Sequence, residues 1–508
     1  MLLRRQVLFF MKCLKAIFCV FVISLFWNAF VFAQNPAQVQ HPALEPVFLP
    51  EDVLTNLDNP NLSADEVFKL ALLFSECPLD SSEALRCLNQ FEDIKAKVTS
   101  PSFMDLGLEE RGRAVLKFLY EDYLTAYNLD QTRTNVALQT GIYNCVSSAL
   151  LYMAAAKAAG LDVRGQKTTE HAFCSIYVPG SKSGQLRKID VETTNPYGFN
   201  PGSREEIENE DKIKSYYVVP KKYYANRQEV SDKAFAGLIA GNICSYSNEQ
   251  DDYKKAVPLG AARYELVRGE KKPATTQIRR DFDVLAANYV NTDVGDALAF
   301  EEYVNWYTSF IDRWGMTDYL QKAMDTALYN LLVLCFQEKD YQQAAQSFEK
   351  YKSYVTAKQI ATCQELLADT FFSSTLEDLS AQEQIDLISE TLARPENAHE
   401  AFQKRGQLYL ENAWLAILNA CMKARDYEKG YYKAEEGLAQ LPKSSKIRTM
   451  RQNFYSNFIA IIHNNFADEA NKGNYKRARE ILEEGLGQFP NDKTLKSDLS
   501  LLNKRTSN

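Results

Sequence analysis

Four copies of a short pattern, an aromatic residue followed three positions later by a small one, recur through the second half of the chain. They are Tyr253-Lys-Lys-Ala256, Tyr341-Gln-Gln-Ala344, Tyr427-Glu-Lys-Gly430 and Tyr475-Lys-Arg-Ala478. The last two copies extend further, because Glu436-Gly-Leu-Ala-Gln-Leu-Pro442 matches Glu484-Gly-Leu-Gly-Gln-Phe-Pro490. A small residue lets one helix approach its partner closely, the aromatic side chain fills the groove between them, and proline ends the second helix. The pattern predicts an all-α helical solenoid over residues 230–508.

This pattern resembles the second helix of tetratricopeptide repeats. Consecutive copies are 88, 86 and 48 residues apart. These offsets are not multiples of about 34, so the repeats would be degenerate or their helices lengthened. The resemblance implies a concave face that binds a peptide or a protein partner. The alternative is that the helices only support the rest of the chain.

Length and composition set the broad limits. A chain of 508 residues is too long for one ordinary domain, so two or three are expected. Hydrophobic residues make up 46% and charged residues 24%, which is a normal globular balance. The formal net charge of -8 argues against a nucleic-acid-binding protein held by a general basic surface.

The N-terminus has the pattern of an export signal. A basic start is followed by an uncharged apolar run that ends at Ala33, which predicts a signal peptide over residues 1–33, cleaved after Ala33. The initiator would be Met1 or Met11, and an uncleaved membrane anchor is the alternative. Residues 34–50 contain four prolines and are predicted to form an extended linker. We therefore expect an exported protein of the periplasm or cell envelope, touching a membrane only if the signal stays attached.

Between the predicted linker and the predicted solenoid, the residue pattern of the sequence changes twice. Residues 51–107 are predicted to be helical, and the stretch from 108 to 225 contains helices, strand-like runs and a loop rich in Gly, Pro, Asn and Ser. Cys77 and Cys87 flank a turn in the helical region, so they could form a disulfide in an oxidising compartment or remain free.

One cysteine in the middle region is placed at the start of a helix. Asn144 is a good N-cap, an apolar face runs from Val146 to Ala156, and Gly160 is a good stop. Cys145 then occupies the first helical position, where unpaired backbone amides and the helix dipole favour a thiolate. A cysteine in that position is poised to act as a nucleophile.

A nucleophilic cysteine needs a base, and His171 is the only histidine between His41 and His399. It opens a run to Val178 that is rich in aromatic and β-branched residues, and a second such run covers residues 186–191 after a Gly- and Ser-rich turn. The two runs are predicted to pair as a hairpin. Asp190 on the second strand could then reach His171 and hold its tautomer.

These residues resemble the transglutaminase-like superfamily of papain-type cysteine enzymes, over about residues 108–225. The shared pattern is Gly141 four residues before Cys145, then His171-Ala-Phe173, then Asp190 on the following strand. The resemblance implies an α+β domain with a helix packed on antiparallel strands, and Cys145, His171 and Asp190 as nucleophile, base and orienting carboxylate. It also implies cleavage or transfer at amide bonds. Many relatives have Asp-Pro-Thr and a tryptophan where this chain has Asp190-Val-Glu and Phe173.

Three further residues are candidates for the oxyanion hole or the cleft. The backbone N–H of Cys145 is the expected first donor. Gln139 is a candidate second donor by analogy with papain-like enzymes, although a plain surface glutamine is the alternative. Tyr143 and Asn144 directly precede the cysteine and would line the cleft or serve only as packing and cap.

Two functions fit this sequence. The first is an exported cysteine protease or amidase that acts on peptide or isopeptide bonds, with helical repeats that recruit a protein substrate or partner. The second is a non-catalytic envelope scaffold that binds peptides and protein partners. We expect no cofactor and no metal, because no phosphate-binding glycine loop, dinucleotide fingerprint or paired histidine motif is present.

Overall fold

The computed structural model describes residues 40–47, 59, 61–201, 213–220, 224 and 226–506. The predicted signal peptide over residues 1–33 and most of the predicted linker lie outside these residues, as does an acidic stretch of sequence at residues 205–211. Among the described residues, no helix combines the length and the apolar character needed to cross a lipid bilayer.

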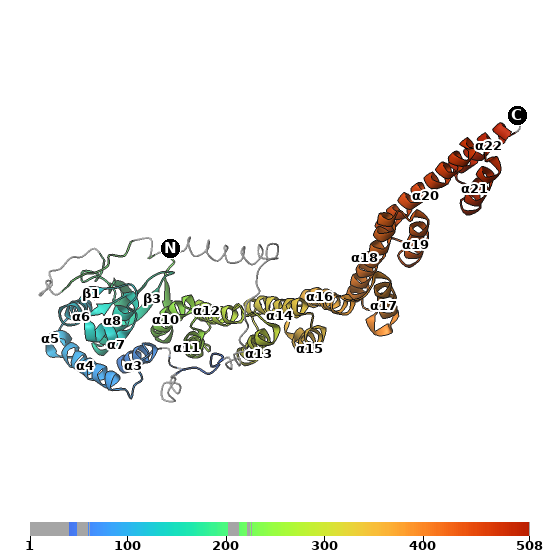
Figure 1. Ribbon diagram of the computed structural model, residues 1–508. Helices are drawn as coiled ribbons and strands as arrows, with labels where there is room; N and C mark the ends of the chain where they lie inside the picture. The colour runs from blue at the N-terminus through green and yellow to red at the C-terminus, as the bar shows by residue number, and fades with distance from the viewer. Residues whose placement is uncertain are drawn as a thin grey trace. The chain divides into compact units, whose positions relative to one another are not determined.

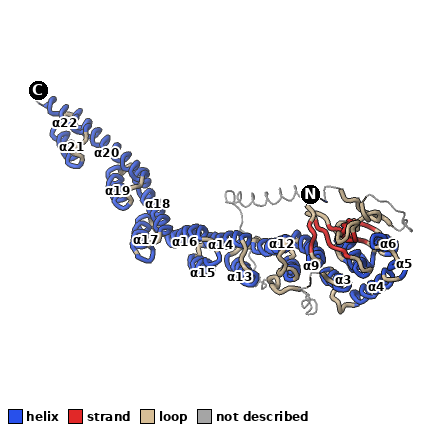
Figure 2. Tube along the Cα trace, turned by 180° about the vertical axis from the view of Figure 1, so that it is seen from behind, coloured by secondary structure: helices blue, strands red, loops and turns tan. Residues whose placement is uncertain are grey.

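The protein is mostly helical and carries one small antiparallel sheet (Figures 1 and 2). The sheet has the strand order β5-β4-β3-β6. Its strands are β3 (Asp162–Lys167), β4 (Ala172–Pro179), β5 (Leu186–Val191) and β6 (Gln228–Val230). Two further short strands, β1 (Ala126–Tyr127) and β2 (Ile142–Tyr143), pair in parallel.

The predicted hairpin is present, and two strands beside it were missed. β4 and β5 pair antiparallel in the expected order. β3 and β6 extend the sheet on the other side of β4, although Asp162-Val-Arg-Gly-Gln-Lys167 has no apolar alternation. The glycine in this strand is needed for packing. A Cβ at Gly165 would lie 2.4 Å from the ring of Phe235 in helix α9 (Asp232–Ala236). The strand is selected by close packing and not by a hydrophobic pattern.

Helix α8 (Cys145–Ala158) lies at the centre of the first part of the molecule. Every residue from Cys145 to Ala156 is buried, so this helix has no solvent face. Strands β3 and β4 and the helices around α8 cover it. The covering helices are α3 (Ala64–Phe74), α4 (Ser82–Val98), α6 (Leu108–Asp122) and α7 (Thr134–Thr140), with the short α5 (Pro101–Met104) between α4 and α6.

The hydrophobic core does not follow the predicted domain boundaries. One continuous cluster of buried side chains runs from Leu62 to Cys363. It includes α3 and α4 from the predicted helical region 51–107, and it continues into the predicted solenoid. The predicted regions 51–107, 108–225 and the start of 230–508 therefore share one core.

From α10 onward the described chain is entirely helical, and neighbouring helices pack in chain order (Figure 1). The first five helices are α10 (Leu238–Glu249), α11 (Tyr253–Glu265), α12 (Pro273–Val290), α13 (Ala297–Trp314) and α14 (Asp318–Glu338). The next four are α15 (Tyr341–Tyr351), α16 (Ala357–Leu376), α17 (Ala381–Ala393) and α18 (Glu400–Ala424). The last four are α19 (Tyr427–Gln440), α20 (Ser445–Asn471), α21 (Tyr475–Gln488) and α22 (Lys493–Thr506).

Each copy of the repeated pattern begins a helix. The four tyrosines are the first residues of α11, α15, α19 and α21, and each of these helices packs on the helix before it. The small residue three positions on is buried in every copy. The expected groove-filling role of the aromatic residue does not hold throughout, because Tyr341 and Tyr475 are 36% and 41% exposed.

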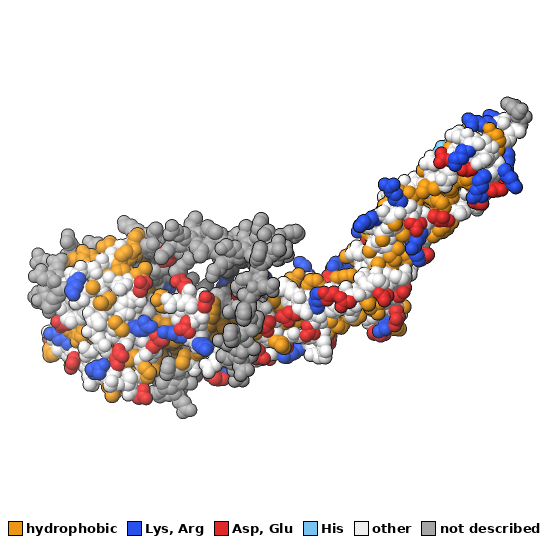
Figure 3. Space-filling model, in the orientation of Figure 1, with side chains coloured by type: hydrophobic (Ala, Val, Ile, Leu, Met, Phe, Trp, Pro, Cys, Tyr) orange, Lys and Arg blue, Asp and Glu red, His pale blue; other side chains and the backbone are white. Residues whose placement is uncertain are grey.

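Two smaller cores follow the first. One lies among buried residues from Ala368 to Phe454 and the other from Phe458 to Leu502. Hydrophobic side chains remain at the surface of this C-terminal part, as the face drawn in Figure 3 shows. The large exposed ones include Leu408, Tyr432, Ile461, Tyr475 and Leu501.

The described part of the predicted linker is packed against helices. The indole N–H of Trp306 in α13 donates to the Pro42 carbonyl at 2.7 Å, and His41 Nδ1 lies 2.8 Å from the Tyr289 hydroxyl of α12. Arg313 pairs with Glu45 at 2.6 Å. An extended segment leaves its backbone carbonyls unpaired, so they accept hydrogen bonds from side chains of the helices.

Candidate active site

Local backbone chemistry sets the start of helix α8. Gly141 ends α7 with a φ of 72° and leaves no room for a side chain, because a Cβ there would lie 2.5 Å from Thr125 Oγ1. Asn144 then caps α8, and its Oδ1 accepts from the backbone N–H groups of Val146 and Ser147 at 2.9 and 3.1 Å. Cys145 is the first residue of the helix, as the sequence indicated.

Cys145 and His171 are neighbours. The Cys145 side chain lies close enough to the imidazole of His171, which comes directly before strand β4, to affect its protonation. His171 Nε2 lies 2.7 Å from Glu192 Oε2. Cys145 is 9% exposed and His171 is 7% exposed, so the pair sits at the edge of the core with limited access to solvent.

The carboxylate against His171 belongs to Glu192, and the expectation for Asp190 is corrected. Asp190 lies opposite Ser175 in the β4–β5 register, and its carboxylate accepts from Ser175 Oγ at 2.8 Å and pairs with Arg227 at 2.5 Å. Ser175 is four residues beyond His171, or about 13 Å along a strand at ~3.3 Å per residue. Glu192 is two residues closer to the end of the hairpin where His171 lies, which brings it within reach.

The Glu192 carboxylate is held from several sides. Oε2 also accepts from the Tyr224 hydroxyl at 2.8 Å. Oε1 accepts from the Thr194 N–H and hydroxyl at 3.1 and 2.8 Å. These contacts fix the position of the buried carboxylate. It can therefore orient the imidazole and stabilise its protonated form.

The surroundings of His171 favour its protonated form. Burial lowers the pKa of its imidazole, but hydrogen bonds to Cys145 and Glu192 and the charges of those groups outweigh burial and raise the pKa to about 10. The imidazolium that this environment favours lies beside the Cys145 sulfur. The arrangement can therefore supply both a nucleophile and a proton donor.

All three candidates for the oxyanion hole or cleft make other contacts. The Gln139 amide donates to Cys87 Sγ at 3.3 Å, on the side of α7 that faces α4. Tyr143 is fully buried, and its hydroxyl accepts from the Tyr120 hydroxyl at 2.9 Å. Asn144 is the helix cap, and its Nδ2 donates to the Leu129 carbonyl at 3.1 Å.

The backbone N–H of Cys145 is the donor that remains. The Asn144 side chain caps Val146 and Ser147 but not Cys145. A second group near the sulfur is Tyr127, whose hydroxyl pKa is raised by burial and by the charge of Cys145. Tyr127 stacks on Tyr217 with ring centres 5.1 Å apart.

The sequence-based reasoning missed Glu192, Tyr224 and Tyr127. The strand register carries a signal for Glu192. Counting outward from the turn between β4 and β5 places Asp190 opposite Ser175 and residue 194 opposite His171, so Glu192 lies two residues nearer to His171 than Asp190 does. No comparable signal existed for Tyr224 or Tyr127, since both reach the site from segments whose course depends on the whole fold.

The other described cysteines differ from Cys145. Cys77 and Cys87 are buried and free. Burial raises the pKa of both thiols. Cys174 is fully buried on the face of β4 toward α8 and donates to the Ala149 carbonyl at 3.3 Å. Among the described residues, no cluster of three or more His, Cys, Asp or Glu side chains is arranged to hold a metal ion.

Comparisons with known proteins identify no family for this chain. No family model matches the chain, and no curated protein matches it. A crystal structure of menin, described as revealing the binding site for Mixed Lineage Leukemia (MLL) protein, aligns over 80% of this chain and 95% of that chain. The identity is 13% and the TM-score is 0.31, which does not establish a shared fold.

Proposed function

We propose that this protein is a cysteine enzyme of the transglutaminase-like, papain-type class, which acts on peptide or isopeptide amide bonds. The observation that carries the proposal is the chain of contacts from Cys145 to His171 to Glu192, with the sulfur at the first position of a capped helix. For the fold, we propose a transglutaminase-like domain that carries this triad and is followed by tetratricopeptide-like repeats.

The geometry supports an acyl-transfer reaction through a thioester. The Cys145 thiolate attacks the amide carbonyl carbon, and the resulting oxyanion is met by the Cys145 backbone N–H. The C–N bond breaks as the His171 imidazolium gives its proton to the leaving amine. Neutral His171 then removes a proton from water, the hydroxide attacks the thioester, and the acid leaves as the Cys145 thiolate and the His171 imidazolium are restored. An amine could replace water in the last step.

The helical repeats would serve as the protein-binding part. The exposed hydrophobic side chains along α18 to α22 are the kind that a partner covers. We further propose that the protein is exported through the segment over residues 1–33 and works in the periplasm or cell envelope. Appending residues 1–33 to a reporter enzyme that is active only after export tests this point, and a reporter that stays inside the cell would contradict it.

Thiol labelling at neutral pH tests the catalytic proposal. We expect iodoacetamide to modify Cys145 faster than the other described cysteines of the reduced, folded protein, with sites assigned by mass spectrometry. The change His171→Ala should remove that advantage. Equal, slow labelling of all cysteines would contradict the proposal and favour a peptide-binding scaffold without catalysis.

A matched pair of changes separates Glu192 from Asp190. Glu192→Gln removes the charge beside the imidazole and should slow the labelling of Cys145 at least tenfold. Asp190→Asn alters a carboxylate that pairs with Arg227 and should leave the rate unchanged. The reverse result would restore Asp190 as the orienting carboxylate.

A further inference from the structure

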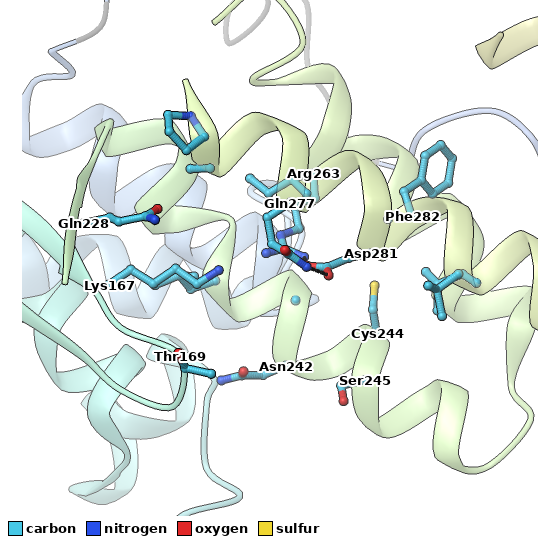
Figure 4. A pocket seen from close by; sticks show the side chains of 18 of the residues that line it. Lys167, Thr169, Gln228, Asn242, Cys244, Ser245, Arg263, Gln277, Asp281 and Phe282 are labelled. Atoms are coloured by element: carbon cyan, nitrogen blue, oxygen red, sulfur yellow. Dashed lines mark hydrogen bonds and ion pairs between the residues drawn. The ribbon is translucent and has the colours of Figure 1, made fainter. Parts of the chain in front are cut away.

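A cavity of about 830 Å³ lies beside the tip of the β3–β4 hairpin and between helices α10, α11 and α12 (Figure 4). It is lined by Lys167, Thr168 and Thr169 from the hairpin and by Gln228 from β6. Ligand-binding cavities commonly measure about 300–1,000 Å³, so its size suits a small molecule.

The positive and negative charges that line this cavity do not cancel. Arg263 of α11 and Lys167 both line it, against one carboxylate, Asp281 of α12. Asp281 pairs with Arg263 at 3.0 Å, and its other oxygen accepts from Gln277 at 2.8 Å. Within the described residues, no carboxylate lies close enough to form an ion pair with the Lys167 ammonium. One positive charge is therefore left over, and Figure 4 shows Lys167 extending toward Arg263 and Asp281.

Arg263 carries a further unused donor. Its side chain is 7% exposed, and its Nε is buried without a hydrogen-bond partner. The guanidinium packs directly over Gly241 of α10, because a Cβ at that position would lie 2.9 Å from Arg263 Cζ. A buried donor without a partner is costly, and an acceptor on a ligand would remove that cost.

The environment of Lys167 also favours an anion. Burial lowers the pKa of its ammonium group, the charge of Arg263 lowers it further, and Asp281 only partly opposes these effects. Because Asp281 already pairs with Arg263, a carboxylate placed between Lys167 and Arg263 would balance the charge of Lys167 and accept hydrogen bonds from both cations.

The opposite wall of the cavity is apolar. Ile278, Phe282 and Leu285 of α12 line it, and each of them is at most 5% exposed. We propose that this cavity binds a small organic carboxylate, with its charged end between Lys167 and Arg263 and its carbon chain against α12. An inorganic anion such as phosphate would leave the apolar wall unused.

The proposal does not depend on catalysis by Cys145, so it can be tested in the Cys145→Ser protein. Titration calorimetry of the full chain would use hexanoate as the probe, with hexanamide and inorganic phosphate as comparisons. We expect hexanoate to bind at least tenfold more tightly than either comparison. Equal binding of hexanamide, tighter binding of phosphate, or no binding of hexanoate would overturn the proposal.

Variants locate the site. Lys167→Met keeps an unbranched side chain of similar shape and removes its charge, and it should weaken hexanoate binding about 10- to 100-fold. The matched control is Lys182→Met in the exposed β4–β5 turn, which should change nothing. If Lys167→Met does not fold, Lys167→Gln should give the same loss. Unchanged affinity in a folded Lys167 variant would overturn the assignment.

Discussion

The part of the molecule around α8 and the part after α16 are both built from helices, yet they bury their residues in different ways. In α8 every residue from Cys145 to Ala156 is buried, and the surrounding core is one cluster from Leu62 to Cys363. Helix α20 is longer, but its buried residues form a stripe that contributes to two small clusters. A shared core holds segments from distant parts of the sequence together, which a triad requires. Small separate cores let the stability of each helical pair depend mainly on its neighbours.

The largest expected effect comes from the shared core. Phe68 of α3 is 1% exposed and stacks on Phe91 with ring centres 4.2 Å apart. Phe68→Ala should cost about 3–5 kcal/mol of unfolding free energy. Because α3 packs on α8, the change should also remove the selective labelling of Cys145. Urea unfolding and iodoacetamide labelling measure both effects.

The control is Leu85→Ala on α4, since Leu85 is 54% exposed. It should alter the free energy by less than about 0.5 kcal/mol. If Phe68→Ala unfolds only α3 and leaves Cys145 reactive, the idea of one shared core is wrong.

A core residue of the C-terminal part should behave differently. Trp414 of α18 is 2% exposed, and Trp414→Ala should cost a similar 3–5 kcal/mol, but only in the unfolding of α17 to α20. Labelling of Cys145 should keep its rate. Hydrogen exchange read peptide by peptide would show the local loss of protection, with Leu408→Ala, 39% exposed, as the control. If Trp414→Ala also lost the labelling of Cys145, the idea that the C-terminal part depends on its own core would be wrong.

A smaller effect is expected where two repeat helices meet. A Cβ at Gly430 in α19 would lie 2.2 Å from the ring of Phe454 in α20, so Gly430→Ala should cost about 1–3 kcal/mol. Gly487 in α21 has nothing within 4 Å of such a Cβ. Gly487→Ala should therefore be neutral or stabilise by up to about 1 kcal/mol. Thermal melts of both variants measure the difference, and equal effects would mean that the small residue is not required for close packing.

The smallest effect concerns pH and should be confined to the first part. The pKa of His171 is raised from 6.5 to about 10, so the stability gained from its protonation is complete below pH 6.5 and is lost as pH rises through about 10. Urea unfolding of the wild type and His171→Gln should show a difference that narrows between pH 8 and 10. A difference that instead grew toward alkaline pH would mean that His171 is neutral in the folded protein.

The helix ends, the hairpin turn and the repeat starts could be predicted from the amino-acid sequence. Asn144 and Gly160 bound α8, the turn after Pro179 fixes the β4–β5 hairpin, and the repeated pattern marks where α11, α15, α19 and α21 begin. Each of these depends on caps, turns and spacing within a few residues, so a single sequence carries the information.

Long-range packing sets which groups meet. Strand register selects Glu192 over Asp190 as the partner of His171, and the packing of α7 on α4 turns Gln139 toward Cys87. The same packing merges the predicted region 51–107 with the core around α8. These outcomes depend on long-range packing, in which a shift of two residues along a strand moves a carboxylate by about 7 Å.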